Sequence, residues 1–321
     1  MTSGHHNSVV FLNERKFSDK QSLKSKIYRN SAYIELSPII LRGTVCGLGV
    51  LEVFIKCKIF LQCMKFKFLG SGGYLRIPRA CCNCKICTEA RVKGSPYERL
   101  GQSLFIEDSN ILFDTPEDIN TELNNHNVKE VEHLFYSHWH PDHTAGLRIL
   151  ETLKANKNEK PVNVYLTKNL KEDLKKKRPA IFYFESLDYC KIKTLNKIKI
   201  NNINIEYVKL NNDFAYCLLI TENKKKVIYC PCHSIDLIAN KKLMNPDLLI
   251  INIGYFGKEK RNVTGFEKDN LPLIKKLKPK TSVFTHIEEI WNKNYDDYCK
   301  LEEKYKDLNI KFAFDGLTIK V

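Results

Sequence analysis

Three of the nine histidines in this 321-residue sequence lie within six residues, together with an aspartate, at His138, His140, Asp142 and His143. Imidazole nitrogens and carboxylate oxygens are common ligands of zinc and similar divalent cations. From an extended segment, His138 and His140 would point the same way and offer one ion two ligands. Asp142 and His143 follow a bend and can serve a second ion. The alternative, a histidine-rich surface loop, would not need four ligand residues at this spacing.

A metal-binding loop of this kind needs elements that turn its side chains toward one point. Residues 133–137 have the pattern of a strand, and residues 146–150 that of the first turns of a helix. Two ions held a few ångströms apart at such a junction can activate a hydroxide and stabilise both oxygens of a displacement. The sequence therefore predicts a catalytic centre between a strand and a helix.

Residues 137–143 resemble the T/S-H-x-H-x-D-H signature of the metallo-β-lactamase fold superfamily and match it at every ligand position. The resemblance covers residues 64–321. It implies an α+β fold, a four-layer αββα sandwich, with the metals at the edge between its two sheets. It also implies a late metal-binding histidine. His286 follows the predicted strand 282–285 and suits that role, with a plain surface histidine as the alternative.

The order of the predicted elements fits such a sandwich. Short apolar or alternating runs predict strands in each half of the chain, and helices follow them. No linker divides residues 64–321, so we expect one domain, and Asp315-Gly316 predicts a closing hairpin turn. The predicted strands are 65–69, 102–107, 111–113, 134–136, 162–166, 203–209, 216–221, 227–229, 248–253, 282–285, 311–314 and 317–320, and the predicted helices are 116–125, 168–177, 266–277 and 295–306.

Residues 1–63 differ from the rest of the chain. Residues 36–63 are apolar but contain four charged residues. The longest uncharged stretch among them, 43–51, is well below the roughly 18–20 residues that a spanning helix needs. A signal peptide with a small-residue cleavage site is not evident. Since Met64 begins a clean strand, we expect residues 1–63 to be a poorly ordered or mis-called amino-terminal extension, with a membrane-associating or targeting segment as the alternative.

Four of the twelve cysteines crowd into residues 81–87. Cys82, Cys84 and Cys87 form a C-x-C-x-x-C knuckle. The geometry of this loop allows the three thiolates to coordinate one zinc ion. Buried or free thiols are the alternative. Such crowding suits a metal site in a reducing compartment and predicts a cytoplasmic protein rather than a secreted, disulfide-bonded one.

With residues 70–73 before it and residues 89–91 after it, this knuckle resembles one branch of the superfamily. That branch contains the phosphoribosyl cyclic phosphate phosphodiesterase of phosphonate breakdown and the pyrroloquinoline quinone biosynthesis B proteins. The resemblance implies a structural zinc whose fourth ligand comes just after the late metal histidine. Glu289 stands in that place, and Cys81 is a nearer competitor.

The superfamily pattern has two further ligands between the signature and the late histidine. The first, a histidine, falls on Asn212, or on Asp213 with a one-residue shift. The second, an aspartate that bridges the metals, falls on Cys232, whose thiolate is a good zinc ligand. His233 beside it is another stand-in, and an ordinary half-buried thiol is the alternative. The branch also has an acid or substrate-contacting histidine in a loop where this chain has Arg261, which could bind a phosphate.

These residues predict a metal-dependent hydrolase, most simply a phosphodiesterase that acts on a small phosphodiester or cyclic phosphate through metal-bound hydroxide, with Asp142 assisting catalysis. One or two zinc ions, or manganese, would lie in the active site and one structural zinc in the knuckle. One alternative is a non-hydrolytic metal-binding member that handles a cofactor-pathway intermediate. Another is a relative of the transfer-RNA 3′-end endonuclease. Two active-site metals would favour the enzyme, and a lone knuckle zinc the binding protein.

The expected partner is a small anionic phosphoester substrate, in agreement with a net charge of +15. Nucleic acid is not favoured, because the lysines are scattered and lack interleaved aromatic residues. A membrane partner is not favoured either. The oligomeric state is left open, with a homodimer as one option.

Overall fold

The computed structural model describes residues 63–156, 160–237, 241–257 and 264–321, and before them the strand residues 26–29, 32–37 and 56–61. The chain divides into two units, Met1–Gln62 and Cys63–Val321. In the first unit, β1 (Lys26–Arg29), β2 (Ala32–Ser37) and β3 (Lys56–Leu61) pair antiparallel in that order. The rest of the predicted extension lies outside the described residues, so the expectation for residues 1–63 stays a prediction.

The second unit contains two mixed sheets of seven strands each. The first sheet is formed by β4 (Lys65–Gly70), β5 (Ser103–Ile106), β6 (Ile111–Phe113), β7 (His133–Phe135), β8 (Val162–Leu166), β9 (Cys190–Thr194) and β17 (Thr318–Lys320). Its strand order is β17-β4-β5-β6-β7-β8-β9. Neighbouring strands run antiparallel from β17 to β6 and parallel from β6 to β9.

The second sheet repeats this pattern with strands from the second half of the unit. It is formed by β10 (Lys197–Ile200), β11 (Ile203–Lys209), β12 (Tyr216–Glu222), β13 (Lys225–Cys230), β14 (Leu248–Asn252), β15 (Thr281–Thr285) and β16 (Ile310–Phe312), in this order. Neighbours run antiparallel from β10 to β13 and parallel from β13 to β16. Each half of the unit thus builds one sheet, and β17 returns to the first.

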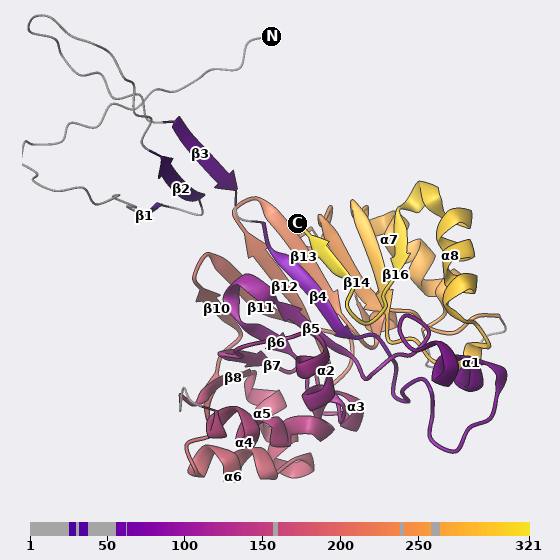
Figure 1. Ribbon diagram of the computed structural model, residues 1–321, viewed down its shortest axis with the longest axis horizontal. Helices are drawn as coiled ribbons and strands as arrows, with labels where there is room; N and C mark the ends of the chain where they lie inside the picture. Colours follow the sequence, from indigo (N-terminus) through magenta and orange to yellow (C-terminus); the bar gives the residue numbers. More distant parts are fainter. Residues whose placement is uncertain are drawn as a thin grey trace, which may run out of the picture. The chain divides into compact units, whose positions relative to one another are not determined.

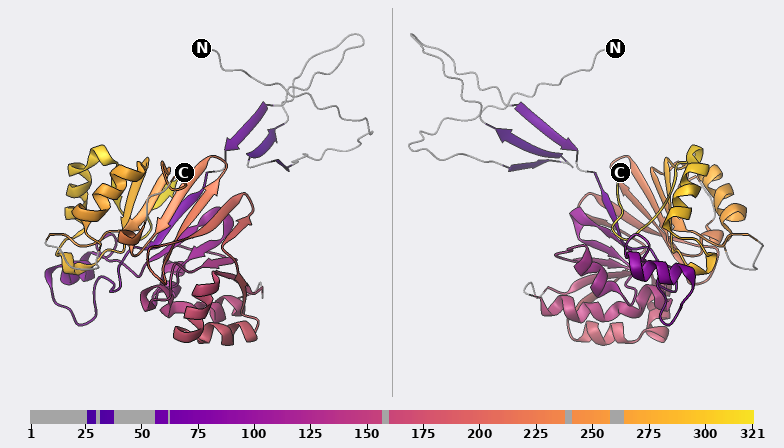
Figure 2. Two further views of the ribbon diagram at one scale, coloured as in Figure 1. Left: turned by 180° about the vertical axis from the view of Figure 1, so that it is seen from behind. Right: turned by 45° about the vertical axis from the view of Figure 1, so that its right-hand side comes forward.

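Helices cover the outer faces of the two sheets, as Figure 1 and Figure 2 show. The α-helices are α1 (Lys85–Lys93), α2 (Ile119–Asn125), α3 (Pro141–Thr144), α4 (Ile149–Ala155), α5 (Lys168–Lys177), α6 (Ala180–Ser186), α7 (Leu271–Leu277) and α8 (Tyr295–Lys304). Helices α4, α5 and α6 contact β8 and β9, whereas α8 contacts β16 of the other sheet. Shorter helical turns are η1 (Glu107–Ser109), η2 (Ala145–Arg148), η3 (Ser234–Asp236), the π-helical η4 (Phe266–Asn270), η5 (Glu289–Trp291) and η6 (Lys306–Leu308). Across the described parts of the chain, no helix has both the length and the apolar composition that a membrane crossing requires.

Two apolar clusters hold the sandwich together, and β14 contributes to both. Its residues Leu248 and Ile250 belong to the cluster that also contains Leu104 of the first sheet. Leu249 and Ile251 belong instead to the cluster that contains the buried side chains of α7 and α8. Because successive strand residues point to opposite faces, β14 is covered on both sides and has a continuous apolar sequence. The predicted α+β class and αββα sandwich are therefore confirmed.

The predicted hairpin at Asp315-Gly316 is wrong. β16 pairs with β15 whereas β17 pairs with β4, so the two strands belong to different sheets. The Asp315 carboxylate accepts hydrogen bonds from the backbone N–H groups of Ser71 and Leu100, at 2.9 and 2.7 Å. The Gly316 N–H donates to the carbonyl of Phe68 at 2.7 Å. This turn therefore carries the chain from the second sheet across to the first.

Candidate metal centre

The candidate metal centre lies at the edge of the sandwich where parallel strands of both sheets end. The loops that follow β6, β7, β13 and β15 carry Asp114, His138, Cys232 and His286. β6 runs parallel to β7, and β13, β14 and β15 are parallel to one another. Ligands of such sheets bind at the carboxyl ends of the strands. Loops from distant parts of the sequence therefore meet at one edge.

The loop formed by residues 137–143 joins β7 to α3, which begins at Pro141. Proline fits the first position of a helix, because the N–H group that it lacks has no partner there. His138 and His143 are buried, and their ring centroids lie 4.2 Å apart. The ring centroids of His138 and His140 lie 4.5 Å apart. The short turn before α3 thus gathers three imidazoles in one place.

His286 follows Asp142 by 144 residues in the sequence, yet its side chain lies beside that aspartate. Its Nε2 lies 3.1 Å from Asp142 Oδ2, and the Nε2 of His143 lies 3.3 Å from the same oxygen. His143, Cys232 and His286 offer ligand atoms within 4.8 Å of one another. We call Asp142, His143, Cys232 and His286 the aspartate group.

A second set of candidate ligands lies beside the aspartate group. His138, Cys232 and His233 offer ligand atoms within 4.8 Å of one another. The ring centroid of His140 is 5.6 Å from that of His233, so His140 borders this set. We call His138, His140, Cys232 and His233 the imidazole group. Cys232 belongs to both groups, which puts one thiol between two candidate metal sites.

The donors of both groups fit divalent cations. The Nε2 atoms of His138 and His233 are buried and have no hydrogen-bond partner within the described part of the chain. Buried polar atoms are nearly always hydrogen-bonded, and an exception calls for an explanation such as an ion. Imidazole nitrogen, thiolate sulfur and carboxylate oxygen are the ligands that zinc takes in proteins. The residues present therefore fit a pair of such ions.

The electrostatics of the site favour a thiolate and a carboxylate among imidazoles. Burial alone would raise the pKa of the Cys232 thiol, but the neighbouring imidazoles, His286 first among them, hold it well below its ordinary value. Burial would also raise the pKa of Asp142, but His143 and His286 hold it low. Burial lowers the pKa of His140 to about 4 and keeps this imidazole neutral, which is the form that binds metals.

Asp114, directly after β6, orients two of these imidazoles and was not predicted from the sequence. Its buried carboxylate lies 2.9 Å from His143 Nδ1 and accepts a hydrogen bond from the Ser137 backbone N–H at 2.7 Å. The Ser137 hydroxyl in turn lies 3.0 Å from His138 Nδ1. Metal-binding histidines usually have such a partner on the second ring nitrogen, which fixes the tautomer and the ring orientation.

Asp114→Asn should weaken active-site zinc binding by roughly 10–100-fold, which is the usual cost of losing a partner of a metal-binding histidine. Asparagine keeps the shape of the side chain and tolerates its left-handed backbone, φ 63°. It lacks the negative charge that supports His143. Competition with a chelator measures the zinc Kd, and Asp173→Asn on the outer helix α5 is the control. An unchanged Kd in Asp114→Asn would mean that Asp114 serves the fold alone.

Three candidate residues from the sequence do not join the two groups. Asn212 accepts hydrogen bonds from two backbone N–H groups of its own loop and donates one to Asp236. Asp213 is exposed and shares neither ligand group. Arg261, the candidate phosphate contact, lies outside the described residues.

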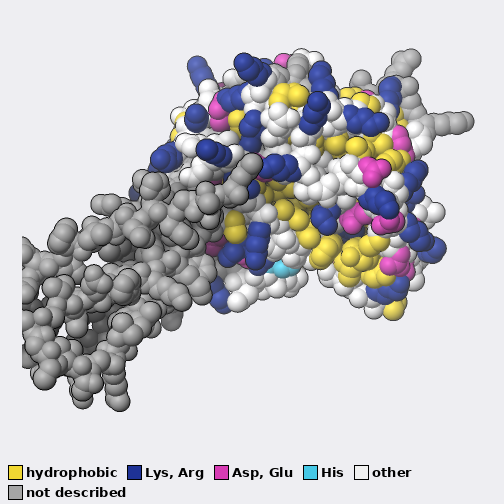
Figure 3. All heavy atoms as spheres, turned by 90° about the horizontal axis from the view of Figure 1, so that it is seen from above, with side chains coloured by type: hydrophobic (Ala, Val, Ile, Leu, Met, Phe, Trp, Pro, Cys, Tyr) yellow, Lys and Arg dark blue, Asp and Glu magenta, His cyan; other side chains and the backbone are white. Residues whose placement is uncertain are grey.

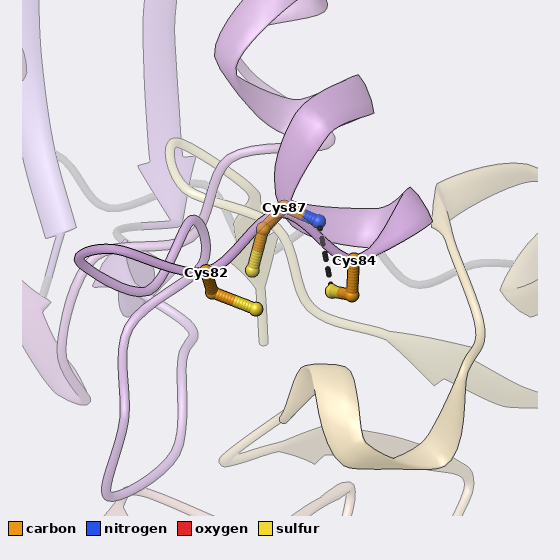
Figure 4. A group of neighbouring side chains, drawn as sticks. All are labelled: Cys82, Cys84 and Cys87. Atoms are coloured by element: carbon orange, nitrogen blue, oxygen red, sulfur yellow. Dashed lines mark hydrogen bonds between the residues drawn. The ribbon is translucent and has the colours of Figure 1, made fainter.

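The three cysteines of the knuckle point into a common space, as Figure 4 shows. The Sγ atoms of Cys82, Cys84 and Cys87 lie within 4.8 Å of one another. Cys84 also caps α1, because its sulfur accepts a hydrogen bond from the Cys87 backbone N–H at 3.4 Å. Hydrogen bonds from the Cys84 backbone and from Arg79 lower the pKa of Cys82 to about 7. The lowered pKa favours the thiolate of Cys82, the form that binds metals, whereas burial raises the pKa of Cys87 to about 11. The close approach of the three sulfurs is what fits a zinc.

Glu289, the candidate fourth ligand, lies near the knuckle. Its buried carboxylate is 2.9 Å from the guanidinium of Arg79, which also donates to the Cys82 thiol at 3.5 Å. Arg79 therefore links Glu289 to the three thiols. Neither Glu289 nor the exposed Cys81 belongs to the group of sulfurs within 4.8 Å. The fourth ligand of the knuckle stays a prediction.

Known proteins share this architecture. The family model described as "Beta-lactamase superfamily domain" matches residues 109–287. A solved diphosphatase from the PhnP family is 20% identical over 81% of this chain and 98% of its own, with a TM-score of 0.64. Zinc-bound PqqB from Methylobacterium extorquens is 16% identical over 80% of this chain and 100% of its own, with a TM-score of 0.65. The short form of human tRNase Z is 15% identical over 80% and 98%, with a TM-score of 0.52. No curated protein matches the sequence.

The sheet edge, its ligand groups and the family match together define the class of this protein. The chain belongs to the β-lactamase superfamily and has the metallo-β-lactamase fold, so the predicted resemblance is confirmed. The solved structures that share the fold include a diphosphatase and a tRNase Z. The fold implies a site for divalent metal ions.

Proposed function

We propose that this protein is a metal-dependent hydrolase that cleaves a small phosphodiester or a cyclic phosphate. The observation that carries the proposal is the meeting of the imidazole group and the aspartate group at Cys232, beside an open cavity. The cavity has a volume of about 180 Å³, and its lining includes Cys232, His233, Asn252, Thr264, His286 and Trp291. This volume is below the roughly 300–1,000 Å³ of drug-sized sites, which suits a small substrate.

The residues around the cavity have separate roles in the proposed reaction. Bound divalent ions would lower the pKa of water and offset the charge that develops on the phosphate oxygens. Asn252 and Thr264 accept backbone hydrogen bonds with their side-chain oxygens, which leaves an amide and a hydroxyl hydrogen to donate to a substrate oxygen. Glu288 lies 3.5 Å from Nδ1 of His286 and orients that ring. His143 and His286 keep Asp142 ionised against the effect of burial, so its carboxylate is in the form that binds a cation.

We infer that the ion is zinc rather than manganese. The thiolate of Cys232 and the imidazoles around it are ligands that select zinc, whereas manganese prefers carboxylate, carbonyl and water oxygens. The expected content is two zinc ions in the active site and one in the knuckle. The crowded thiols of the knuckle suit a reducing compartment, which supports a cytoplasmic location.

A small anion fits the surface better than a polynucleotide. On the face seen in Figure 3, Lys and Arg side chains are spread among acidic, apolar and other side chains and do not form one patch. Nucleic-acid binding relies on clustered cations that contact successive phosphates. This face therefore favours a small anion over a nucleic acid as the partner.

Hydrolysis of bis(p-nitrophenyl) phosphate tests the proposed function. Zinc-loaded protein should hydrolyse it, chelation should stop turnover, and added zinc should restore it. His140→Ala should lose active-site zinc and turnover. The control is His133→Ala, whose ring contacts Tyr165 outside the site and which should keep both. Undiminished turnover in His140→Ala would contradict the proposal, and zinc-loaded wild-type protein without turnover would favour the non-hydrolytic binding protein.

A further inference from the structure

We propose that His233 is the third imidazole ligand of the metal held by the imidazole group, in place of the histidine that the superfamily pattern puts at position 212. The inference rests on the proposed metal chemistry and deepens it, because it assigns a ligand that the signature does not contain. Cys232 and His233, adjacent in the chain, would then complete both metal sites from a single loop.

Asn212 is not available as a ligand. Its Oδ1 accepts hydrogen bonds from the backbone N–H groups of Phe214 at 3.2 Å and Ala215 at 2.7 Å. Its Nδ2 donates to Asp236 Oδ2 at 2.8 Å. Both polar ends of the amide are therefore used within the loop between β11 and β12. A metal ion bound by His138 and His140 would therefore lack the third imidazole that the superfamily pattern provides.

The imidazole of His233 lies close to those of His138 and His140. Its ring centroid is 5.6 Å from those of both His138 and His140. Its ligand atom falls within 4.8 Å of those of His138 and Cys232. Its Nε2 is buried and has no hydrogen-bond partner among the described residues, and the same holds for the Nε2 of His138. One metal ion would satisfy both of these nitrogens together with the thiol.

The backbone holds His233 in an uncommon conformation. Its φ of 56° and ψ of 35° lie in the left-handed region, which residues with a Cβ rarely adopt. The next residue, Ser234, is fixed on both sides, because its N–H donates to Asn252 Oδ1 and its hydroxyl to Asn270 Oδ1, each at 2.9 Å. Such strained residues persist only where the surroundings enforce them, and they cluster at functional sites. His286 of the aspartate group has the same left-handed backbone, with a φ of 59°.

This conformation also permits a clean test, because glycine and asparagine adopt it readily. His233→Gly and His233→Asn should fold like the wild type and keep the knuckle zinc. They should bind one active-site zinc at least about 10–100-fold more weakly, since even the loss of a ligand's hydrogen-bond partner has that effect. Added imidazole should restore the zinc affinity of His233→Gly, because it can enter the space of the lost ring.

The measurements are zinc per chain by elemental analysis, the zinc Kd by chelator competition and the absorption spectrum of the cobalt(II)-substituted protein. Asn212→Ala is the matched variant and should bind zinc like the wild type. Unchanged zinc affinity in His233→Gly, or a loss confined to Asn212→Ala, would overturn the assignment of His233. Wild-type protein with zinc in the knuckle and none in the active site would instead overturn the proposed function, so the two failures can be told apart.

Discussion

Cys232→Ala is expected to lose both active-site metals and at least about 10³-fold of the hydrolytic rate, because bound ions supply several kcal/mol of transition-state stabilisation. The reason is that Cys232 belongs to both the imidazole group and the aspartate group. Its replacement also removes the negative charge around which the imidazoles of both groups are buried. Zinc per chain and turnover of bis(p-nitrophenyl) phosphate, measured on the same sample, check this result.

Two further variants separate the loss of a ligand from the loss of a packed side chain. Cys232→Asp, which introduces the residue of the superfamily pattern, should keep both metals and much of the turnover. Cys230→Ala is the matched control, since Cys230 is equally a thiol of this segment but is not among the ligand residues of either group. Its sulfur donates a hydrogen bond to the Cys232 carbonyl. Cys230→Ala should keep the metals. Two active-site metals in Cys232→Ala would disprove the shared-ligand role of this thiol.

Asp142→Ala is expected to lose the metal of the aspartate group and to slow turnover by at least about 10²-fold, because a bound ion supplies several kcal/mol of transition-state stabilisation. The carboxylate lies 3.3 Å from His143 Nε2 and 3.1 Å from His286 Nε2, so its removal takes away the anion that both imidazoles share. Zinc per chain should fall by one while the knuckle zinc stays. Steady-state kinetics on the same diester gives the change in rate.

Asp213→Ala is the control for this variant. Asp213 was a candidate ligand in the sequence, but it is exposed and outside both ligand groups. Its replacement should leave zinc content and turnover as they are. Metal loss in Asp213→Ala together with full metal content in Asp142→Ala would show that the aspartate group is wrongly assembled.

Several strands of the sandwich could be predicted from their local pattern of apolar residues. β6, β8 and β11 have the predicted bounds, 111–113, 162–166 and 203–209. β6 is an apolar run buried at every residue, whereas β11 alternates between buried and less buried side chains, and both patterns indicate where a strand begins and ends. The ligands of residues 138–143 were equally visible, because they share one loop and match a signature.

Features that depend on pairing between distant segments could not be predicted. Asp114 has no motif around it, and it reaches His143 because β6 lies parallel to β7. The Asp315-Gly316 turn has the local signal of a hairpin, yet β17 pairs with a strand from the start of the unit. The place of His233 beside His138 likewise follows from the meeting of β7 and β13 at one edge, which no spacing in the sequence reveals.

Anomalous X-ray diffraction at the zinc edge, on crystals of zinc-loaded protein, tests most directly whether the two ligand groups hold metal ions. We expect one peak between His138, His233 and Cys232 and a second between Asp142, His143 and His286. A third peak should lie among the sulfurs of the knuckle. A map with the knuckle peak but no density beside Cys232 would contradict the metal centre and the hydrolase function built on it.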